Sequence, residues 1–295
     1  MYIANVLTVT GFLLSQAVAH GLITRIKGDN GVVMPGLTVM DGMPRGCPSA
    51  ACGAQGDTAI IRDQEMDGNK ASPLGRTNTG GPVNPATVIN SFMGAGNSNS
   101  KRAAFTDQRR QMINDAASII TNAGGAILNG AQDLADATPF GGAIKNAQSA
   151  VDDVAGLVPG MGSGAMTSSD SKENGNQQYA GHGSSKGLPT PNENSIITMT
   201  YHQVNQDGAG PLFADIDATS GGTDPRAFKS AEVIKNVPGV AGFSTSSTMD
   251  YDVQVKVPSG MKCRGTVGAT RNVCIVRVRN NAISGPFGGS AAFTN

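Results

Sequence analysis

Apolar and polar residues alternate most clearly in the C-terminal third of the chain. In residues 250–257, Tyr and Val are separated by Asp, Gln and Lys, and this period of two predicts a half-buried strand. Residues 195–204 form a second β-rich run that ends in a turn rich in Gly. Residues 261–267 and 272–279 predict a hairpin whose turn spans residues 265–271.

The chain begins with an uncharged segment, residues 1–19, which contains an apolar run and ends in Ala17-Val18-Ala19. An apolar run before a small-x-small motif is typical of a secretory signal peptide, and cleavage would leave His20 as the first residue. The run is shorter than the ~20 residues that a membrane-spanning helix needs. A predicted strand, residues 22–27, follows directly and would hold His20 close to a sheet.

The middle of the chain has two different compositions. Residues 31–93 are rich in Gly, Pro and turn pairs, which predicts long loops. Residues 94–187 are dominated by small and polar residues. Within them, apolar stripes predict short helices over 105–120 and 144–154, and the composition of residues 160–186 is typical of disorder.

These patterns predict an antiparallel β-sandwich with long loops. Short strands separated by turn signals support this fold class, and no alternation of strands with helices argues for a parallel sheet. We expect one β domain formed by residues 20–93 and 188–295. Residues 94–187 would be a partly helical, partly disordered insertion in that domain.

The balance of charged residues limits the classes of partner that the chain is expected to bind. The chain of 295 residues has 22 basic and 22 acidic residues, so its formal net charge is zero. Proteins that bind nucleic acids or anionic membranes carry a basic excess or stripe, and neither partner is expected here. We expect an extracellular protein that has no membrane partner after signal cleavage and is a monomer.

Four cysteines in an exported chain favour two disulfides. Pairing Cys47 with Cys52 and Cys263 with Cys274 is preferred because each pair is local, although four cysteines allow other pairings. A zinc site would need a CxxC-like pattern or histidines near the cysteines, and neither occurs.

Candidate metal chemistry rests on the histidines, of which the chain has three. His20 at a mature terminus could bind a metal through both its free amine and its imidazole. His202 follows a β-rich run and precedes a Gly-rich turn. Two imidazole nitrogens and one amine suit the tetragonal geometry of Cu(II) better than a tetrahedral zinc site. His182 lies between two glycines, and we expect it to be an exposed loop residue.

Further side chains are candidates for roles around this site. Phe287, or alternatively Tyr201, could lie beside the axial position of a bound metal. Polar side chains could orient an oxygen species as catalytic partners of the metal, or they could instead be ordinary strand-edge charges and turn caps. These candidates are Arg277, Arg279, Gln203 and Asp207.

Four segments also carry a family resemblance. MTYHQVNQDGAGP, CRGTVGATRNVCIVRVRN, GPFGG and CPSAACGAQGDTAIIRDQEMDGNKASPLGR together resemble the secreted fungal Egh-type virulence-factor family, which includes appressorium-associated proteins. That family in turn is distantly similar to the lytic polysaccharide monooxygenases. The resemblance implies an immunoglobulin-like β-sandwich and a copper histidine brace at His20 and His202, with Phe287 as an axial neighbour.

Three functions follow as hypotheses. The first is a copper-dependent enzyme linked to host penetration, which would oxidise cell-wall polysaccharide with electrons from an external donor and O2 or peroxide. The second is a non-catalytic protein of the same fold that binds copper or coats a surface. The third is a structural adhesin in which His20 has no metal role. The expected partner is cell-wall polysaccharide or another host surface.

Overall fold

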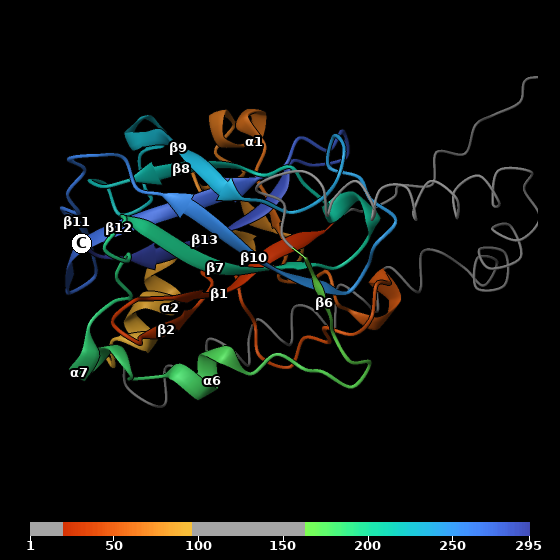
Figure 1. Cartoon of the computed structure of the whole chain (residues 1–295), viewed down its shortest axis with the longest axis horizontal. Coiled ribbons are helices and arrows are strands. Elements are labelled where there is room, and N and C mark those ends of the chain that lie inside the picture. The colour runs from red at the N-terminus through yellow and green to blue at the C-terminus, as the bar shows by residue number, and fades with distance from the viewer. Residues whose placement is uncertain (1–19, 96–162) are drawn as a thin grey trace, which may run out of the picture.

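The computed structural model describes residues 20–95 and 163–295 (Figure 1). Within these residues the chain folds mainly into antiparallel strands, with a few short helices around them. The strands are β1 (Gly21–Lys27), β2 (Val33–Pro35), β3 (Ala59–Ile60), β4 (Arg76–Thr77), β5 (Gly81–Pro82), β6 (Ala165–Met166), β7 (Ile196–Gln203), β8 (Phe213–Asp217), β9 (Phe228–Lys235), β10 (Met249–Lys256), β11 (Gly265–Val267), β12 (Thr270–Arg279) and β13 (Phe287–Phe293).

The described strands form one continuous, curled sheet. Its order is β2-β1-β7-β10-β9-β8-β12-β13-β3-β4-β5, with β11 beside β12 and β6 beside β10. Every strand pair is antiparallel. The prediction of a mostly antiparallel β protein is therefore confirmed, while the immunoglobulin-like connectivity remains a prediction.

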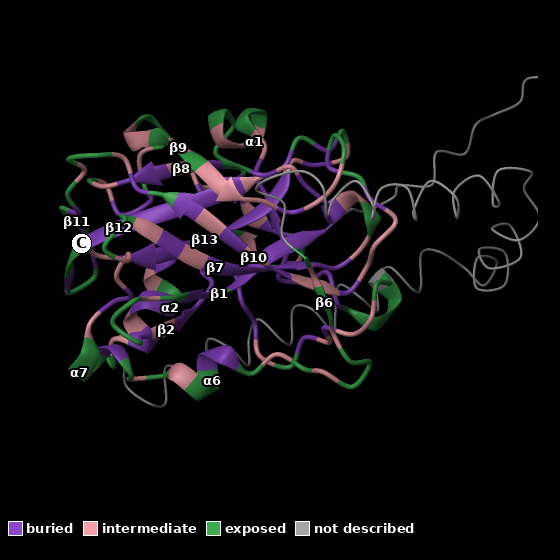
Figure 2. Ribbon diagram, in the orientation of Figure 1, coloured by how far each residue is buried: buried purple, intermediate pink, exposed green. Residues whose placement is uncertain are grey.

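The alternating pattern that predicted strands also determines which side chains enter the core. On β10, Tyr251, Val253 and Val255 are buried, and the residues between them are partly exposed. Tyr251 lies opposite Tyr201 of β7, so both strands bury the same face. Figure 2 shows the buried residues concentrated along the central strands. Each fully buried aliphatic or aromatic side chain of this kind contributes about 1.5–3 kcal/mol.

Curling of the sheet brings β1 against β13, although these strands are not hydrogen-bonded neighbours. A Cβ atom on Gly289 would lie 2.5 Å from the main-chain nitrogen of Ile23. Any larger residue at position 289 would therefore push the two strands apart. This close approach places the start of β13 next to the start of β1.

The short helices cover the edges of the sheet. On α2, Asn84 caps the N-terminus by accepting a hydrogen bond from Ala86 N at 3.0 Å, and Pro85 occupies the first turn. The buried face of α2 includes Ile89 and Phe92, which join the core. The helices are α1 (Asp63–Asp67), α2 (Pro85–Phe92), α6 (Gly175–Tyr179) and α7 (Gly183–Lys186), with 3₁₀ turns at Ala50–Cys52, Gln206–Gly208 and Pro225–Ala227.

Residues 163–186 are ordered against the sheet, so the prediction of disorder is wrong for them. Strand β6 pairs with β10, and Lys172 bridges Pro44. Arg45 N also donates to Ser171 O at 2.8 Å. The segment satisfies its backbone groups with distant partners, which composition alone does not reveal. Residues 1–19 and the predicted helices 105–120 and 144–154 lie outside the described residues.

Both local disulfides are confirmed, with Cα atoms 6.6 Å apart for Cys47 and Cys52 and 4.9 Å apart for Cys263 and Cys274. The C-terminal hairpin is tighter than predicted, because β11 ends at Val267 and β12 begins at Thr270. Among residues 20–95 and 163–295, no helix is both long and apolar enough to cross a membrane.

Candidate metal site

His20 lies at the start of β1 and is held by its main chain. Its carbonyl accepts a hydrogen bond from Val204 N at 3.0 Å, and its nitrogen donates to Asn205 Oδ1 at 2.8 Å. Two residues further along, Leu22 lies opposite His202. His20 is therefore a diagonal neighbour of His202 across β1 and β7, a relation in which Cα atoms are typically roughly 7–8 Å apart. The structure brings the two predicted metal ligands to adjacent strand ends.

His202 is fully buried, with 0% of its surface exposed. Its Nδ1 lies 2.7 Å from Oδ1 of Asp250, the residue directly opposite on β10. An ionised carboxylate accepts but does not donate, so a neutral imidazole in this pair would place its proton on Nδ1 and leave the lone pair on Nε2. Nε2 has no hydrogen-bond partner among the described residues. A buried nitrogen with a free lone pair is suited to ligate a metal.

The two predicted axial neighbours differ in their relation to His20. The ring of Phe287 lies beside His20, with ring centroids 5.3 Å apart and planes at 41°. Tyr201 instead points into the core, where its hydroxyl donates to Gly208 O at 2.7 Å and burial raises its pKa. Phe287 is therefore the apolar wall of the site, and Tyr201 is a core residue.

Gly208 explains why a glycine-rich turn follows β7. A Cβ atom at this position would lie 2.2 Å from the carbonyl oxygen of His20. Only glycine allows the turn to pack directly on the main chain of His20. The same turn contains Asp207, so the sequence after β7 both positions His20 and places a carboxylate close by.

Gln203 and Asp207 hold the loops around the histidines. The Gln203 side chain donates to Ser244 Oγ at 2.9 Å and to Ser246 O at 2.7 Å, and the residue is fully buried. Asp207 accepts a 3.3 Å hydrogen bond from Ser284. Burial raises the pKa of Asp207, and the Ser284 hydrogen bond only partly opposes this shift. Both contacts fix loop positions rather than reach toward a reacting atom.

Two predicted candidates have contacts elsewhere. Arg277 donates to Asp215 Oδ2 at 2.8 Å and to Pro73 O at 2.6 Å, and its guanidinium lies 4.3 Å from the centroid of the Phe228 ring. Arg279 donates to Asp63 at 2.6 Å. Both arginines are therefore held by contacts that do not involve the histidines, and we do not include these arginines in the site.

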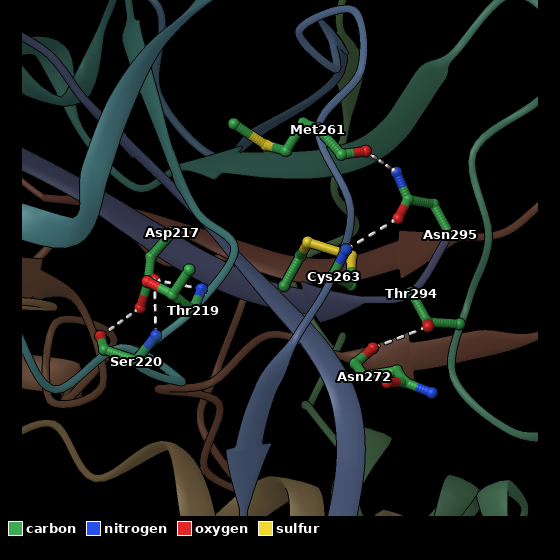
Figure 3. Close-up of a disulfide and its surroundings, with 9 residues drawn as sticks. Asp217, Thr219, Ser220, Met261, Cys263, Asn272, Thr294 and Asn295 are labelled. Carbon is green, nitrogen blue, oxygen red and sulfur yellow. Dashed lines mark hydrogen bonds between the residues drawn. A yellow bond between two sulfur atoms is a disulfide. The ribbon is translucent and has the colours of Figure 1, made fainter.

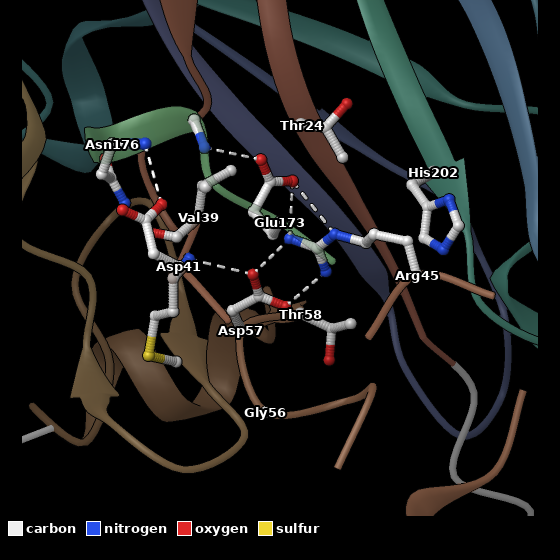
Figure 4. Close-up of polar contacts among 12 residues, drawn as sticks. Thr24, Val39, Asp41, Arg45, Gly56, Asp57, Thr58, Glu173, Asn176 and His202 are labelled. Carbon is white, nitrogen blue, oxygen red and sulfur yellow. Dashed lines mark hydrogen bonds and ion pairs between the residues drawn. The ribbon is translucent and has the colours of Figure 1, made fainter. Parts of the chain in front are cut away.

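An ion-pair network that sequence reasoning missed lies close to the site (Figure 4). Arg45 is buried and donates to both oxygens of Asp57, at 2.9 and 2.6 Å, and to Glu173 at 3.1 Å. Burial disfavours its charge, but the two carboxylates outweigh this effect and raise its pKa. Arg45, Glu173 and Asp250 line one cavity of about 160 Å³. The network anchors loops over the strand face that carries His202.

Asp250 and Asn205 were also missed. In the sequence, Asp250 is one of several polar residues expected to point outward from an alternating strand, and Asn205 is a turn residue. Their roles depend on strand pairing, because Asp250 meets His202 only when β10 lies beside β7. His182 is exposed immediately before α7, as predicted, with its ring centroid 5.6 Å from that of Tyr179.

The predicted brace differs from a metal site built from side chains alone. Within residues 20–95 and 163–295, no three His, Cys, Asp or Glu side chains gather as a metal site. A histidine brace needs only two imidazoles, because its third nitrogen is the terminal amine. His202 meets the requirement for a buried, oriented imidazole, and the nitrogen of His20 already lies in a defined position beside Asn205.

Comparisons with known proteins agree over nearly the whole chain. A sequence model of the Egh16-like virulence factor family matches residues 18–288. Appressoria-specific virulence factor GAS2 of Pyricularia oryzae is 41% identical over 296 residues, covering 100% of this chain and 89% of that protein. Appressoria-specific virulence factor GAS1 of the same species is 35% identical over 106 residues, covering 36% of this chain and 41% of that protein. No solved structure matches the chain significantly.

Proposed function

This chain belongs to the Egh16-like virulence factor family, and we propose that it is a secreted member that binds copper through a histidine brace of His20 and His202. The names of its relatives describe appressoria-specific virulence factors, and a role in host penetration is proposed by analogy with them. Secretion is proposed from the signal-peptide pattern of residues 1–19.

One observation carries the copper proposal. The buried imidazole of His202 is oriented by Asp250 at 2.7 Å, and its Nε2 has no hydrogen-bond partner in the described part of the chain. Leaving a buried polar atom unsatisfied costs about 1–3 kcal/mol. A metal would satisfy this nitrogen, and the carboxylate behind the ring would increase its basicity.

The remaining groups would complete the site around that imidazole. After cleavage the His20 nitrogen would be an amine with an unperturbed pKa of about 7.7–8.0, which a metal can deprotonate near neutral pH. Asn205 Oδ1 would accept one amine proton and keep the lone pair directed away from itself. Phe287 would exclude water from one side of His20. Copper, when bound, would supply one-electron redox chemistry.

Copper titration by calorimetry tests this function. Protein that begins at His20 should bind one equivalent of Cu(II) tightly, and His202→Ala should remove the tight phase. His182→Ala is the matched control, because His182 is exposed just before α7, and it should bind copper as the unchanged protein does. Equal affinity in the His202→Ala variant would contradict the proposal.

A second candidate function is copper-dependent oxidation of a neutral polysaccharide. Residues 237–248 and 280–290 contain no charged side chain and expose Val240 at 73%, Phe243 at 50% and Ile283 at 103%. The two segments pack together, since a Cβ on Gly242 would lie 2.6 Å from the Cβ of Ala282. They also connect to the site through Ser244 and Ser284. An uncharged, partly apolar surface is suited to the C–H faces of a neutral glycan.

This candidate ranks second because His202 has 0% exposure, which favours metal retention over attack on a polymer. Incubation with copper, a reductant and chitin or cellulose, followed by mass spectrometry, distinguishes the two. Oxidised oligosaccharides that disappear in Phe243→Ser would support oxidation. Copper binding without any oxidised product would support a copper-binding protein that has no oxidase activity.

A further inference from the structure

A second potential binding site lies apart from the histidines. A groove of about 640 Å³ is lined by residues from the β8–β9 connection, β9 and the loop 258–264. Its volume falls within the ~300–1,000 Å³ of typical ligand pockets. None of the histidines or of the residues that contact them lines this groove. Any ligand here would therefore bind independently of the metal site.

The groove is strongly basic although the whole chain is neutral. Four cationic residues line it, Arg226, Lys229, Lys262 and Arg264, and its described lining contains no Asp or Glu. Arg226 pairs with Asp224, but 89% of the arginine side chain remains exposed. Among the described residues, the side chains of the other three form no ion pair or hydrogen bond. Their charges are therefore available to a ligand.

One wall of the groove is held rigidly. Cys263 is joined to Cys274 by a disulfide, and its main-chain nitrogen donates to Asn295 Oδ1 at 3.0 Å (Figure 3). The amide of Asn295 donates in turn to Met261 O at 2.9 Å. Arg264 N donates to Ala218 O at 2.7 Å, which ties this loop to the opposite wall. Binding would therefore require little ordering of the loop.

The opposite wall is fixed by the buried carboxylate of Asp217. This group accepts hydrogen bonds from Thr219 N and Ser220 N at 2.8 Å and from Gly222 N at 2.6 Å. Burial would raise the pKa of Asp217, but a hydrogen bond from the Ser220 hydroxyl and these backbone hydrogen bonds outweigh burial and lower it. Its negative charge is thus committed to the turn and does not neutralise the cations of the groove.

We propose that this groove binds an acidic polysaccharide whose sugar rings carry carboxylates. Lys229, Lys262 and Arg264 would pair with the carboxylates, because ammonium and guanidinium groups are their natural partners. Between the cations, apolar atoms of Ala227, Pro258 and Met261 offer contact to the C–H faces of sugar rings.

Other polyanions fit this groove less well. Its lining contains no aromatic side chain on which bases could stack, and the neutral chain lacks the basic excess of nucleic-acid-binding proteins. A bilayer is flat, whereas these cations lie around a concavity. A uronate polymer combines carboxylates with ring C–H surfaces, so it matches both features of the groove.

Binding of galacturonate oligomers tests the proposal, with their methyl-esterified forms as uncharged probes of the same length. Calorimetry should detect binding of the charged oligomer at low ionic strength, and added salt should weaken it. The methyl ester should bind at least about tenfold more weakly. In the Lys229→Gln/Lys262→Gln double variant the affinity for the charged oligomer should fall about tenfold, since two exposed ion pairs are lost.

Lys186→Gln is the matched control, because Lys186 is exposed on α7 and does not line the groove. It should bind the charged oligomer as the unchanged protein does, and thermal melts should show that all variants fold. Equal binding of the charged and esterified oligomers would overturn the proposal. So would undiminished binding by the double variant, no binding at all, or tighter binding of a DNA duplex of equal charge.

Discussion

Substitution of Asp250 tests whether its carboxylate orients His202 for metal binding. Replacing Asp250 by Asn preserves its size and removes its charge. In the native protein, Oδ1 accepts from the Nδ1–H of His202 at 2.7 Å, a distance typical of a charge-assisted hydrogen bond. A neutral amide would accept more weakly, or it would rotate and present its NH2 group. In either case the Nε2 lone pair would be less basic and less strictly oriented.

The size of the effect follows from the position of the carboxylate. Only 30% of the Asp250 side chain and 1% of the His202 side chain are exposed, so solvent screens the interaction only partly. Losing a carboxylate behind a metal-bound imidazole typically lowers metal affinity about 10- to 100-fold. This loss corresponds to about 1.4–2.8 kcal/mol of binding free energy.

The assay is a competition titration of Cu(II) against a chelator, using protein that begins at His20. Asp252→Asn is the matched control, because Asp252 lies two residues further along β10 and pairs with the exposed Lys27 at 3.4 Å. The Asp250→Asn variant should lose about 10- to 100-fold in affinity, and the control should lose almost none. Equal affinities in the two variants would refute the role of Asp250.

Three further predictions concern stability. Arg45→Met should lower the free energy of unfolding by about 3–5 kcal/mol in urea, because it leaves Asp57 buried without its cation, whereas the exposed Arg226→Met should leave it almost unchanged. Asp217→Asn should destabilise by about 1–3 kcal/mol at neutral pH, since donors of the 219–222 turn lose an acceptor. The pKa of Asp217 is lower in the folded state, so its carboxylate stabilises the fold above the unfolded pKa of about 3.9. This stabilisation disappears as the pH falls through the folded pKa. A difference in thermal stability between the native protein and the Asp217→Asn variant that does not change with pH would contradict this assignment. Replacing both Cys263 and Cys274 by Ser should cost about 2–4 kcal/mol in chemical unfolding, and an unchanged midpoint would contradict a stabilising disulfide.

Local patterns in the sequence were sufficient for β1, β7, β10, the β11–β12 hairpin and both disulfides, but not for β8, β9 or β13. Alternation around Tyr251 identified β10, because one face of that strand is buried and the other is not. Each disulfide joins cysteines close in the chain, so nearest-neighbour pairing was correct. The two histidines were proposed as ligands from their positions, His20 after a cleavage motif and His202 at a strand end.

Long-range pairing is what the sequence alone could not provide. Arg45 and Glu173 are 128 positions apart, and neither residue carries a local sign of the other. Without their contact, residues 163–186 resemble a disordered segment, although the structure shows them docked on the sheet. Arg277 was a candidate partner of the metal because of its charge, and its pairing with Asp215 likewise depends on long-range strand contacts.

The amine of His20 is the central requirement of the copper proposal, and one comparison tests it directly. Electron paramagnetic resonance with one equivalent of Cu(II) would be recorded for two forms, one sequenced to begin at His20 and one with a short Gly/Ser extension before it. The extension converts the amine to an amide and leaves both imidazoles unchanged. We predict a tetragonal spectrum with nitrogen couplings in the first form and its loss in the second. Identical spectra and affinities in the two forms would contradict the histidine brace.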